Sequence, residues 1–364
     1  MIKLNMLTGD LIFRQHKTGV HFMHEYLMNE AIKDGFFNLT VSFYRKQKEF
    51  LKKYKLINTE KVSFAFASPL MKILIYFIPV QWIFGKQDVY FCDGIFPAMI
   101  GKSKRICLIH DLMVYRYPEN YSLIMKIYLR VYFHRAKKAD RIITVSQTTK
   151  EDIVKYLKID PNIIDVAYPG VKEAKNIAQI NTEVPSKYIF YIGDSRKNKN
   201  LIGAVHGFAD YINKTKEDMY FLIAGGGDKT ELKSEIQKIG MTERVWLLGY
   251  ISEQEKNYLY KHAYAFIFVS FFEGFGVPIL EAMMRGVPVI TSNTSSMREI
   301  AEGYAILVNP YDYESISNGI LKLSDDNVRQ DCIKLGHQCV KKYNWKHTYN
   351  VIKKSIRMTI SIKE

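Results

Sequence analysis

The sequence contains no apolar run long enough to cross a membrane as a helix. Its most apolar stretch, residues 69–85, is interrupted by Lys72, Pro79 and Gln81, and it falls short of the roughly 20 apolar residues that a span requires. The N-terminus lacks the basic leader and apolar core of a secretory signal. We therefore expect a cytoplasmic protein in which residues 69–85 form a buried or interfacial helix.

Cysteine is also scarce. The four that occur lack the short spacing of a zinc site or of a disulfide framework; they are Cys92, Cys107, Cys332 and Cys339. We expect four reduced thiols. Long polar or repetitive tracts are absent too, which excludes a largely disordered chain.

What is present is an ordinary globular composition, with 48% hydrophobic and 24% charged residues. At 364 residues the chain exceeds the roughly 250 to 300 residues at which a single core stops growing, so we expect two domains. The net charge of +15 is uneven, because residues 1–165 hold 26 Lys and Arg against 15 Asp and Glu, a balance of +11. The counterpart of this basic half could be nucleic acid, an anionic membrane surface or a phosphate-bearing substrate.

Strand-like segments alternate with helix-like segments along most of the chain. In the second half, short β-rich runs end in or beside polar residues or glycine, and they occupy residues 188–193, 220–227, 245–250, 265–270, 287–293 and 305–310. The first half repeats the pattern less regularly, at residues 4–9, 88–94, 105–111 and 140–147. This alternation predicts an α/β protein with two doubly wound, Rossmann-like domains that face each other across a cleft, where ligands bind at the carboxyl ends of the strands.

The boundaries of these domains follow from composition. We place the first domain at residues 1–170 and the second at residues 187–345, joined by a polar linker at residues 171–186 that contains Pro185. A C-terminal helix follows at residues 346–364, and the sequence leaves open whether it crosses back to the first domain.

One stretch of the second domain combines a glycine turn with two carboxylates. In FFEGFGVPILEAMMRG, residues 271–286, Glu273 and Glu281 enclose the turn, and Pro278 suits the first turn of a helix. The backbone amides of the turn would form an anion site at the start of this helix. Carboxylates bind sugar hydroxyls, so the phosphate would go to the amides and the hydroxyls to the acids. In isolation, two glutamates at this spacing are more often solvated helix residues.

Residues 268–312 closely resemble the donor-site signature of the retaining, nucleotide-sugar-dependent glycosyltransferases of family four (group 1), which have two Rossmann-like domains of the GT-B type. Further matching segments include YIGDSRKNKNLIGAVHGF in the second half and LIHDLMVYRYPENY in the first. The resemblance covers about residues 88–345. It implies a GT-B fold and hexosyl transfer from a nucleoside diphosphate sugar, with retention at the anomeric carbon and without a metal or other cofactor.

The resemblance also implies roles for single residues. Glu281 would bind the ribose hydroxyls, Glu273 would contact the donor sugar, and Lys199 would neutralise the diphosphate. The family's usual arginine is replaced by Asn198, and Arg196 is the candidate to take its place. The remaining donor-binding positions are glycines or backbone amides, namely Gly19, Gly193, Gly274, Phe275, Gly276 and Val277.

In the first domain, His110 matches the family's acceptor-side histidine. It would hydrogen-bond the donor sugar near the anomeric carbon, through its ring or its carbonyl. Asp111 would either orient His110 or cap the following turn.

A cation at Lys199 also makes physical sense, because cleavage of the sugar–phosphate bond leaves negative charge on the departing nucleoside diphosphate. The sequence shows no cluster of Asp residues beside the turn that would chelate magnesium. No carboxylate of the first domain stands out as a nucleophile. We therefore favour a front-face reaction, in which the departing phosphate helps to deprotonate the incoming hydroxyl.

Residues 121–141 give an indication of the acceptor. In this segment, basic residues alternate with aromatic and aliphatic ones at helical spacing. The basic residues are Lys126, Arg130, Arg135, Lys137, Lys138 and Arg141. Such a helix either presents a solvated basic face or lies on an anionic leaflet. With the basic first half, we favour peripheral attachment to the inner face of the plasma membrane and a lipid-linked saccharide acceptor, in the assembly of O-antigen, capsule or exopolysaccharide.

Two alternatives stay open. A sugar-nucleotide epimerase or a phosphorylase of the same build would use the same phosphate-binding turn without an acceptor sugar. A basic nucleic-acid-binding protein would explain the charge, but the sequence has no helix-turn-helix, zinc or RNP-type motif, so we expect no nucleic acid partner.

Overall fold

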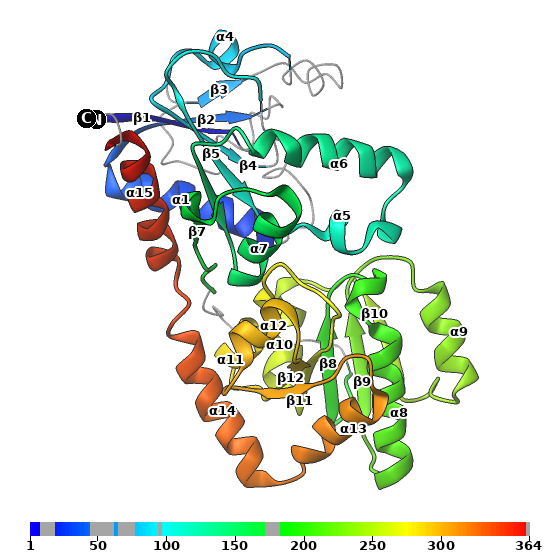
Figure 1. Ribbon diagram of the computed structural model, residues 1–364. Coiled ribbons are helices and arrows are strands. Elements are labelled where there is room, and N and C mark those ends of the chain that lie inside the picture. The colour runs from blue at the N-terminus through cyan, green and yellow to red at the C-terminus, as the bar shows by residue number, and fades with distance from the viewer. Residues whose placement is uncertain (8–18, 44–61, 65–76, 94–96, 172–182, 362–364) are drawn as a thin grey trace. The chain divides into compact units, whose positions relative to one another are not determined.

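The computed structural model describes residues 1–7, 19–43, 62–64, 77–93, 97–171 and 183–361. The chain forms two compact units (Figure 1): one consists of Met1–Gly170 and Trp345–Glu364, and the other of Val171–Asn344. Most of the polar stretch expected as a linker lies outside the described residues.

The described residues of the first unit form a parallel sheet of seven strands in the order β3-β2-β1-β4-β5-β6-β7. The strands are β1 (Ile2–Leu7), β2 (Phe37–Phe43), β3 (Val62–Phe64), β4 (Val89–Asp93), β5 (Lys104–Ile109), β6 (Arg141–Thr144) and β7 (Ile164–Val166). The runs expected in the first half became β1, β4, β5 and β6. The sequence reading missed β2 and also β3 and β7, which have only three residues each and are too short to give a periodic signal.

The described part of the first unit also contains helices, most of which lie between its strands in the chain. They are α1 (Gly19–Asp34), α4 (Val80–Phe84), α5 (Met113–Arg116), α6 (Leu123–Ala136), α7 (Gln147–Asp152) and α15 (Trp345–Ser361), with short turns at η3 (Pro118–Asn120), η4 (Ile153–Leu157) and η5 (Pro161–Ile163). Of the helix expected at residues 69–85, the structure shows only α4, since residues 69–76 lie outside the described part. Val80 and Phe84 of α4 are buried, whereas Trp82 between them is exposed.

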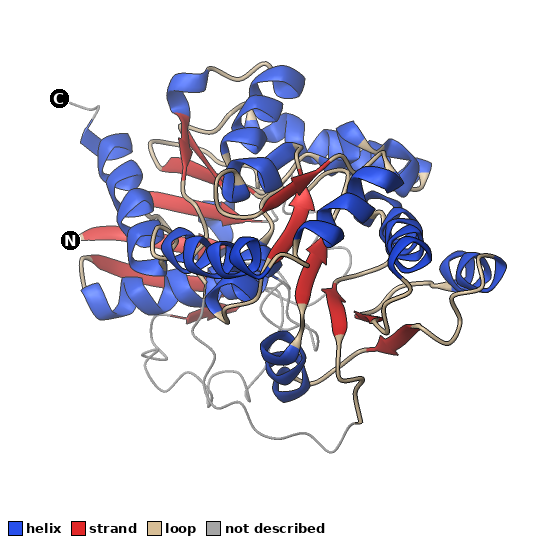
Figure 2. Ribbon diagram, turned by 90° about the horizontal axis from the view of Figure 1, so that it is seen from below, coloured by secondary structure: helices blue, strands red, loops and turns tan. Residues whose placement is uncertain are grey.

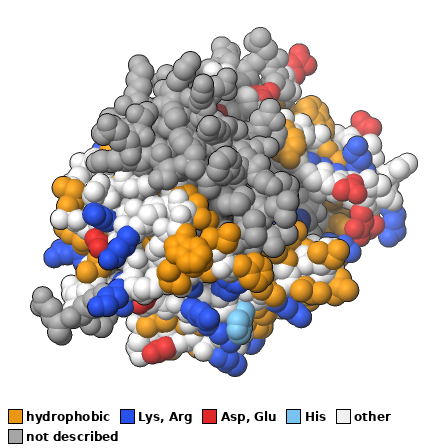
Figure 3. Space-filling view, turned by 90° about the horizontal axis from the view of Figure 1, so that it is seen from above, with side chains coloured by type: hydrophobic (Ala, Val, Ile, Leu, Met, Phe, Trp, Pro, Cys, Tyr) orange, Lys and Arg blue, Asp and Glu red, His pale blue; other side chains and the backbone are white. Residues whose placement is uncertain are grey.

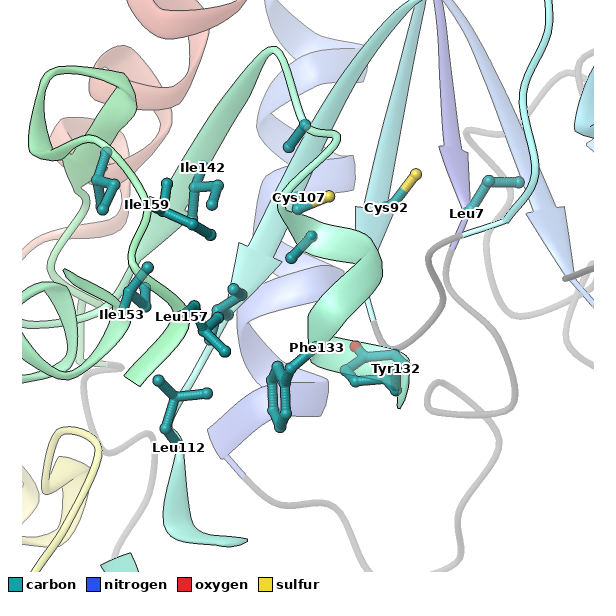
Figure 4. Close-up of a cluster of buried hydrophobic side chains, with 14 of the residues drawn as sticks. Leu7, Cys92, Cys107, Leu112, Tyr132, Phe133, Ile142, Ile153, Leu157 and Ile159 are labelled. Carbon is teal, nitrogen blue, oxygen red and sulfur yellow. The ribbon is translucent and has the colours of Figure 1, made fainter. Parts of the chain in front are cut away.

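A hydrophobic core lies between the sheet of the first unit and its helices (Figure 4). Tyr132 and Phe133 on the inner face of α6 belong to this core, together with Leu112 and Ile142. Cys92 and Cys107 are buried in the same cluster and are neighbours on β4 and β5, yet both are free thiols, as are the other two cysteines. Burial raises the pKa of Cys92 to about 12, which makes it a poor nucleophile.

Helix α15 belongs to the first unit, although it is the last element of the chain. Its Trp345 ring stacks on Tyr26 of α1 with 4.6 Å between the ring centroids. Its Tyr349 hydroxyl and Lys353 ammonium both donate to Asp34 Oδ2, over 2.7 and 2.6 Å. Figure 1 shows α15 beside α1, so the C-terminal helix braces the first domain.

The second unit is built on a parallel sheet of six strands in the order β10-β9-β8-β11-β12-β13. The strands are β8 (Tyr188–Ile192), β9 (Tyr220–Ala224), β10 (Val245–Gly249), β11 (Ala265–Phe268), β12 (Val289–Ser292) and β13 (Ile306–Val308). All six runs expected in the second half therefore became strands. Figure 2 shows the helices that flank these strands.

Except for the last two, those helices connect consecutive strands, as a parallel sheet requires. They are α8 (Leu201–Thr215), α9 (Thr230–Lys238), α10 (Glu253–His262), α11 (Val277–Met284), α12 (Ser295–Ala301), α13 (Tyr313–Lys322) and α14 (Asp326–Val340), with a short turn at η6 (Lys197–Lys199). Both units thus have the doubly wound α/β architecture that the sequence predicted. Within the described ranges, every helix falls short of the length and apolar character that crossing a membrane requires.

The strand order fixes where a ligand can bind in the second unit. The order reverses between β8 and β11, because β8 is followed in the chain by its neighbour on one side and pairs with β11 on the other. Doubly wound sheets bind ligands at the carboxyl ends of the two strands on either side of such a switch point. The segments that follow β8 and β11 contain Lys199 and Glu273.

Candidate functional site

The loop between β11 and α11 has the local structure that its sequence predicted. Gly276 precedes α11 with φ of 121°, a backbone conformation that side chains with a Cβ rarely adopt, and Pro278 lies in the first turn of the helix. Gly286 follows the end of the helix with φ of 70°, as expected for a left-handed cap. The first backbone N–H groups of a helix have no acceptor within it, so the start of α11 is a suitable place for an anion.

Glu273 lies in this loop and forms an ion pair with Lys199. The Lys199 ammonium is 2.7 Å from Oε1 and 2.9 Å from Oε2 of the carboxylate, and each side chain is only 11% exposed. Ser295 at the start of α12 holds the loop, because its hydroxyl accepts from the Glu273 amide and donates to the Glu273 carbonyl. The two charged residues expected at the donor sugar and the diphosphate are therefore direct neighbours.

Asn198 and Arg196 have different environments. Asn198 is fully buried. Its side-chain NH2 group donates to the Phe272 backbone carbonyl, and its backbone carbonyl accepts from the Phe271 backbone amide. It thereby joins η6 to the loop that carries Glu273. Arg196 is about half exposed and its guanidinium binds Asp194 instead. Burial acts to raise the pKa of Asp194, but the contacts with Arg196 leave this pKa below its ordinary value.

Glu281 belongs to a second, separate ion pair. Its Oε1 is 3.3 Å from the Lys256 ammonium, and its Oε2 accepts from the Tyr260 hydroxyl at 3.3 Å; both partners lie on α10. The side chain of Glu281 is 19% exposed. Burial, reinforced by the Glu281 charge, raises the pKa of Tyr260 well above its ordinary value, so the phenol remains a hydrogen-bond donor. Glu281 thus keeps some access to solvent while Lys256 and Tyr260 fix its position.

Gly193 follows β8, and the structure gives a packing reason for a glycine there. A Cβ at Gly193 would overlap the hydroxyl of Tyr191, whose ring is buried and whose hydroxyl donates to the Asp194 carbonyl at 3.0 Å. At Gly225, after β9, a Cβ would overlap the Gly193 carbonyl, and φ is 117°. The backbones at the ends of β8 and β9 therefore lie too close together to leave room for a Cβ at Gly225.

The other expected donor positions divide into two kinds. The Phe275 ring is buried and packs edge-on against Tyr343 at 5.8 Å, so only its backbone is available to a ligand. Gly276 and Val277 form the start of α11. Gly19 is the first residue of α1 in the first unit, and the loop before it, residues 8–18, lies outside the described part.

His110 follows β5 in the first unit and contacts Asp93, the last residue of β4. The distance from His110 Nε2 to Asp93 Oδ2 is 3.1 Å, and the His110 carbonyl accepts from the Thr149 hydroxyl. Burial acts to lower the pKa of His110, but the adjacent Asp93 carboxylate outweighs it, so the pKa is raised above its ordinary value. Asp111 accepts from the Met113 amide at 2.9 Å and thus caps the following turn, which was one of its two expected roles.

Sequence reasoning missed several residues that the structure adds to these sites, namely Asp93, Asp194, Lys256, Tyr260, Ser295 and also His24, whose Nε2 contacts the Asp93 carboxylate. Asp93 had a readable signal, because it ends a predicted strand in the same way as His110 follows the next one. Lys256 and Tyr260 sit on an ordinary helix, and nothing in their local sequence distinguishes them. Among the described residues, no group of three or more His, Cys, Asp or Glu is arranged to hold a metal ion.

Two family models match the chain and together span most of it. The model described as Glycosyl transferases group 1 matches residues 172–340, and the model described as Glycosyltransferase Family 4 matches residues 38–175. Their boundary, near residue 172, coincides with the division between the two units.

Individual proteins agree with the family models. The chain is 32% identical over 217 residues to the O-antigen chain mannosyltransferase RfbU of Salmonella typhimurium, a match that covers 58% of each chain. It is 27% identical over 258 residues to O-antigen chain mannosyltransferase B of Escherichia coli, covering 67% of this chain and 68% of the relative. In fold, it is similar to sucrose-phosphate synthase from Thermosynechococcus elongatus, with a TM-score of 0.75, 16% identity and 100% coverage of both chains. The chain therefore belongs to the group 1 glycosyltransferases and has their two-domain GT-B fold.

Proposed function

We propose that this glycosyltransferase moves a hexosyl group from a nucleoside diphosphate sugar to a hydroxyl of a saccharide acceptor, with retention at the anomeric carbon. The observation that carries the proposal is the ion pair between Lys199 and Glu273 at the switch point of the second sheet, beside the start of α11. A cation, a helix N-terminus and a carboxylate at one sheet edge suit the two parts of a sugar phosphate.

The charges of the pair explain how a donor would be held. A diphosphate bound at the start of α11 would place anionic oxygens near the Lys199 ammonium, which has three hydrogens to share between the phosphate and Glu273. Glu273 would then keep lone pairs for sugar hydroxyls. As the sugar–phosphate bond breaks, charge accumulates on the departing phosphate, and Lys199 and the helix amides stabilise it.

The protein contributes positioning and charge stabilisation in this scheme, so we favour a front-face reaction, in which the departing phosphate accepts the proton of the incoming hydroxyl. Arg196 could supply a second cation only if it released Asp194, since that carboxylate binds its guanidinium. We propose no metal and no cofactor beyond the donor itself.

The names of the relatives suggest which donor sugar and which acceptor to test first. Both matched mannosyltransferases are described as acting on the O-antigen chain. We therefore propose a role in the assembly of a cell-surface polysaccharide, with mannose as the first sugar to test and a lipid-linked saccharide as the acceptor.

The outer face of α6 supports a membrane location for that acceptor. Hydrophobic side chains on this helix are strongly exposed, with Ile124 82%, Leu123 71%, Ile127 57% and Val131 55% accessible, and Trp82 of α4 is 73% accessible. Figure 3 shows hydrophobic side chains beside Lys and Arg side chains on the face seen from above. Exposed apolar side chains among basic ones fit an anionic lipid surface, so we propose peripheral attachment there.

One of the basic residues expected on this surface does not belong to it. Arg141 is 8% exposed because it lies on β6, where its guanidinium pairs with Asp165 of β7. The helix ends at Ala136, five residues earlier, so the interpretation of residues 121–141 as one basic helix was wrong at its C-terminal end. The basic residues that remain there are Lys126, Arg130, Arg135, Lys137 and Lys138.

The proposed activity can be tested in two steps. A thermal-shift panel of UDP-, GDP-, dTDP- and ADP-sugars identifies the nucleotide, because a ligand that binds only the folded state raises the unfolding temperature by mass action. The stabilising sugar nucleotide is then incubated with lipid-linked saccharides, and the anomeric configuration of the product is read by NMR. Inversion at the anomeric carbon, or trapping of a covalent glycosyl-enzyme, would contradict the proposed mechanism.

A further inference from the structure

Asp93 joins two histidines at the carboxyl end of the first sheet. Nε2 of His110 is 3.1 Å from Asp93 Oδ2, and Nε2 of His24 contacts the same oxygen. His24 lies on α1, Asp93 ends β4 and His110 follows β5, so the cluster links three elements. Of the three residues, only His110 was among those expected to contact the donor sugar.

Burial increases along this cluster from one end to the other. The side chain of His110 is 20% exposed, that of Asp93 is 2% exposed and that of His24 is fully buried. His24 Nδ1 is buried and has no hydrogen-bond partner within the part of the chain that the structure describes. Burying a carboxylate, and leaving a ring nitrogen unsatisfied beside it, both cost free energy, which points to a role for the cluster other than stability.

The contacts assign the ring nitrogens of His110. Because a carboxylate is an acceptor, Nε2 of His110 carries the hydrogen that Asp93 receives, and Nδ1 is the ring nitrogen left for another partner. A carboxylate that holds an imidazole in one orientation and one tautomer prepares it for interaction with a substrate. The Thr149 hydroxyl, which donates to the His110 carbonyl at 3.3 Å, fixes the backbone of the same residue.

We propose that Asp93 and His24 are positioning residues for His110: Asp93 orients the imidazole with Nε2 protonated and Nδ1 available to the substrate, and His24 holds Asp93 in place. The catalytic consequence rests on the proposed glycosyl transfer, whereas the effect on His110 itself does not.

The charges around His110 give this arrangement a measurable signature. Among the described residues, the groups that act on it are the carboxylates of Asp93 and Asp111 and the neighbouring imidazole of His24. The Asp93 carboxylate raises the pKa of His110 against the effect of burial, while burial lowers the pKa of His24. Loss of the Asp93 charge must therefore lower the pKa of His110.

The first experiment is an NMR titration of isotopically labelled histidines in the full-length protein without substrate. In Asp93→Asn, the His110 pKa should fall by about one unit or more. In Asp93→Glu, which keeps the charge but displaces it, the pKa should stay nearer the wild-type value. The control is Asp152→Asn, which removes another buried carboxylate of the same unit, one that pairs with Arg116, and should leave the His110 pKa unchanged.

The second experiment measures kinetics with the nucleotide sugar that the wild-type protein uses. Both Asp93→Asn and Asp93→Glu should lower kcat by about 100-fold with little change in the donor KM, because a misplaced group affects the reaction more than the binding. His24→Gln keeps a donor for Asp93 and should retain most of kcat, whereas His24→Leu removes the donor and should lose about tenfold.

The outcomes separate this inference from the proposed function. A His110 pKa that is the same in Asp93→Asn and wild type would overturn the inference, even if the protein is an active transferase. If the His110 pKa falls in Asp93→Asn but the wild-type protein uses no nucleotide sugar, the proposed function is wrong. The link between Asp93 and His110 is then still supported. If Asp93→Asn does not fold, the comparison of His24→Leu with His24→Gln decides, and equal kcat values for those two variants would count against a positioning role.

Discussion

The Lys199 ammonium lies within hydrogen-bond distance of both carboxylate oxygens of Glu273, at 2.7 and 2.9 Å, across 74 positions of sequence. Each side chain is 11% exposed, so neither charge can rely on water for its solvation. Removal of one partner would leave the other charge buried and alone.

This ion pair gives the first prediction. Lys199→Met should lower the free energy of unfolding of the second unit by about 3 to 5 kcal/mol, as in other buried pairs that lose one partner. The double variant Lys199→Met/Glu273→Gln should be less destabilised than the sum of the two single variants, because it leaves no unpaired charge. Chemical denaturation measures all three. Additive effects would mean that the pair does not couple. Lys214→Met, on a pair that is exposed, serves as the control and should change little.

The second prediction concerns nucleotide binding by Glu281. Glu281→Gln should weaken binding of the nucleoside diphosphate by about tenfold or more, because hydrogen bonds to a charged group contribute roughly 1.5 to 3 kcal/mol. Isothermal titration calorimetry with the nucleotide measures this change. Glu302→Gln, on an exposed pair with Arg298, is the matched control. Equal affinity of Glu281→Gln and wild type would remove Glu281 from the donor site.

The third prediction concerns the close approach of β8 and β9. Gly193→Ala should lower the free energy of unfolding by about 1 to 3 kcal/mol, since its Cβ overlaps the Tyr191 hydroxyl. Tyr191→Phe in the same chain should recover part of the loss, because the ring remains but its oxygen is gone. Gly225→Ala should be the more damaging change, because its Cβ meets rigid backbone and its φ of 117° disfavours alanine. Thermal unfolding of the wild type and the three variants gives the order, and a neutral Gly225→Ala would contradict it.

The fourth prediction tests the exposed face of α6. The protein should bind vesicles that contain phosphatidylglycerol at low salt, and it should dissociate as salt rises, because its basic residues contribute about 1 kcal/mol each near an anionic surface. Ile124→Ser/Ile127→Ser should weaken binding at least about tenfold, since full burial of one such side chain contributes ~1.5 to 3 kcal/mol. Met358→Ser, on the exposed side of α15, should bind like wild type. Flotation measures all three, and absence of binding by the wild-type protein at low salt would rule out membrane attachment through this face.

The fifth prediction is a pH dependence of stability at α15. The hydrogen bonds from Lys353 and Tyr349 hold the pKa of Asp34 below its ordinary value. The folded state therefore binds a proton at Asp34 less readily than the unfolded state, so the contribution is fully present at neutral pH and is lost as the pH falls below about 4. The difference in unfolding temperature between wild type and Asp34→Asn should be largest near pH 7 and should shrink in acid. Asp331→Asn, at an exposed site, should show no such trend. If the difference in unfolding temperature between wild type and Asp34→Asn grew in acid, the Asp34 pKa could not be lowered in the folded state, and the prediction would be wrong.

Much of the second unit was predictable because its signals are local. Each of its strands is a short apolar segment, and each observed strand lies within the range of residues that the sequence predicted for it. Gly276, Pro278 and Gly286 determine where α11 begins and ends through their own backbone preferences, which depend little on the rest of the chain. The basic excess of the first half is likewise a property of composition alone.

Other features depended on which strands became neighbours. Lys199 meets Glu273 because β8 pairs with β11, and Asp93 meets His110 because β4 pairs with β5. The apolar pattern of a strand does not specify its partner, so the sequence predicted His110 without Asp93 or His24. Arg141 was misplaced for the same reason, because its burial depends on Asp165 of the adjacent strand.

The sequence by itself thus determined the type of each domain, the caps of α11 and the residues able to hold a sugar phosphate, because these follow from periodicity, backbone preference and side-chain chemistry. Only the tertiary structure decided which charges are paired, which helix face is left exposed and where the last helix returns. Those outcomes follow from the order of the strands and from the packing of segments far apart in the chain, as with Asp34 and Lys353.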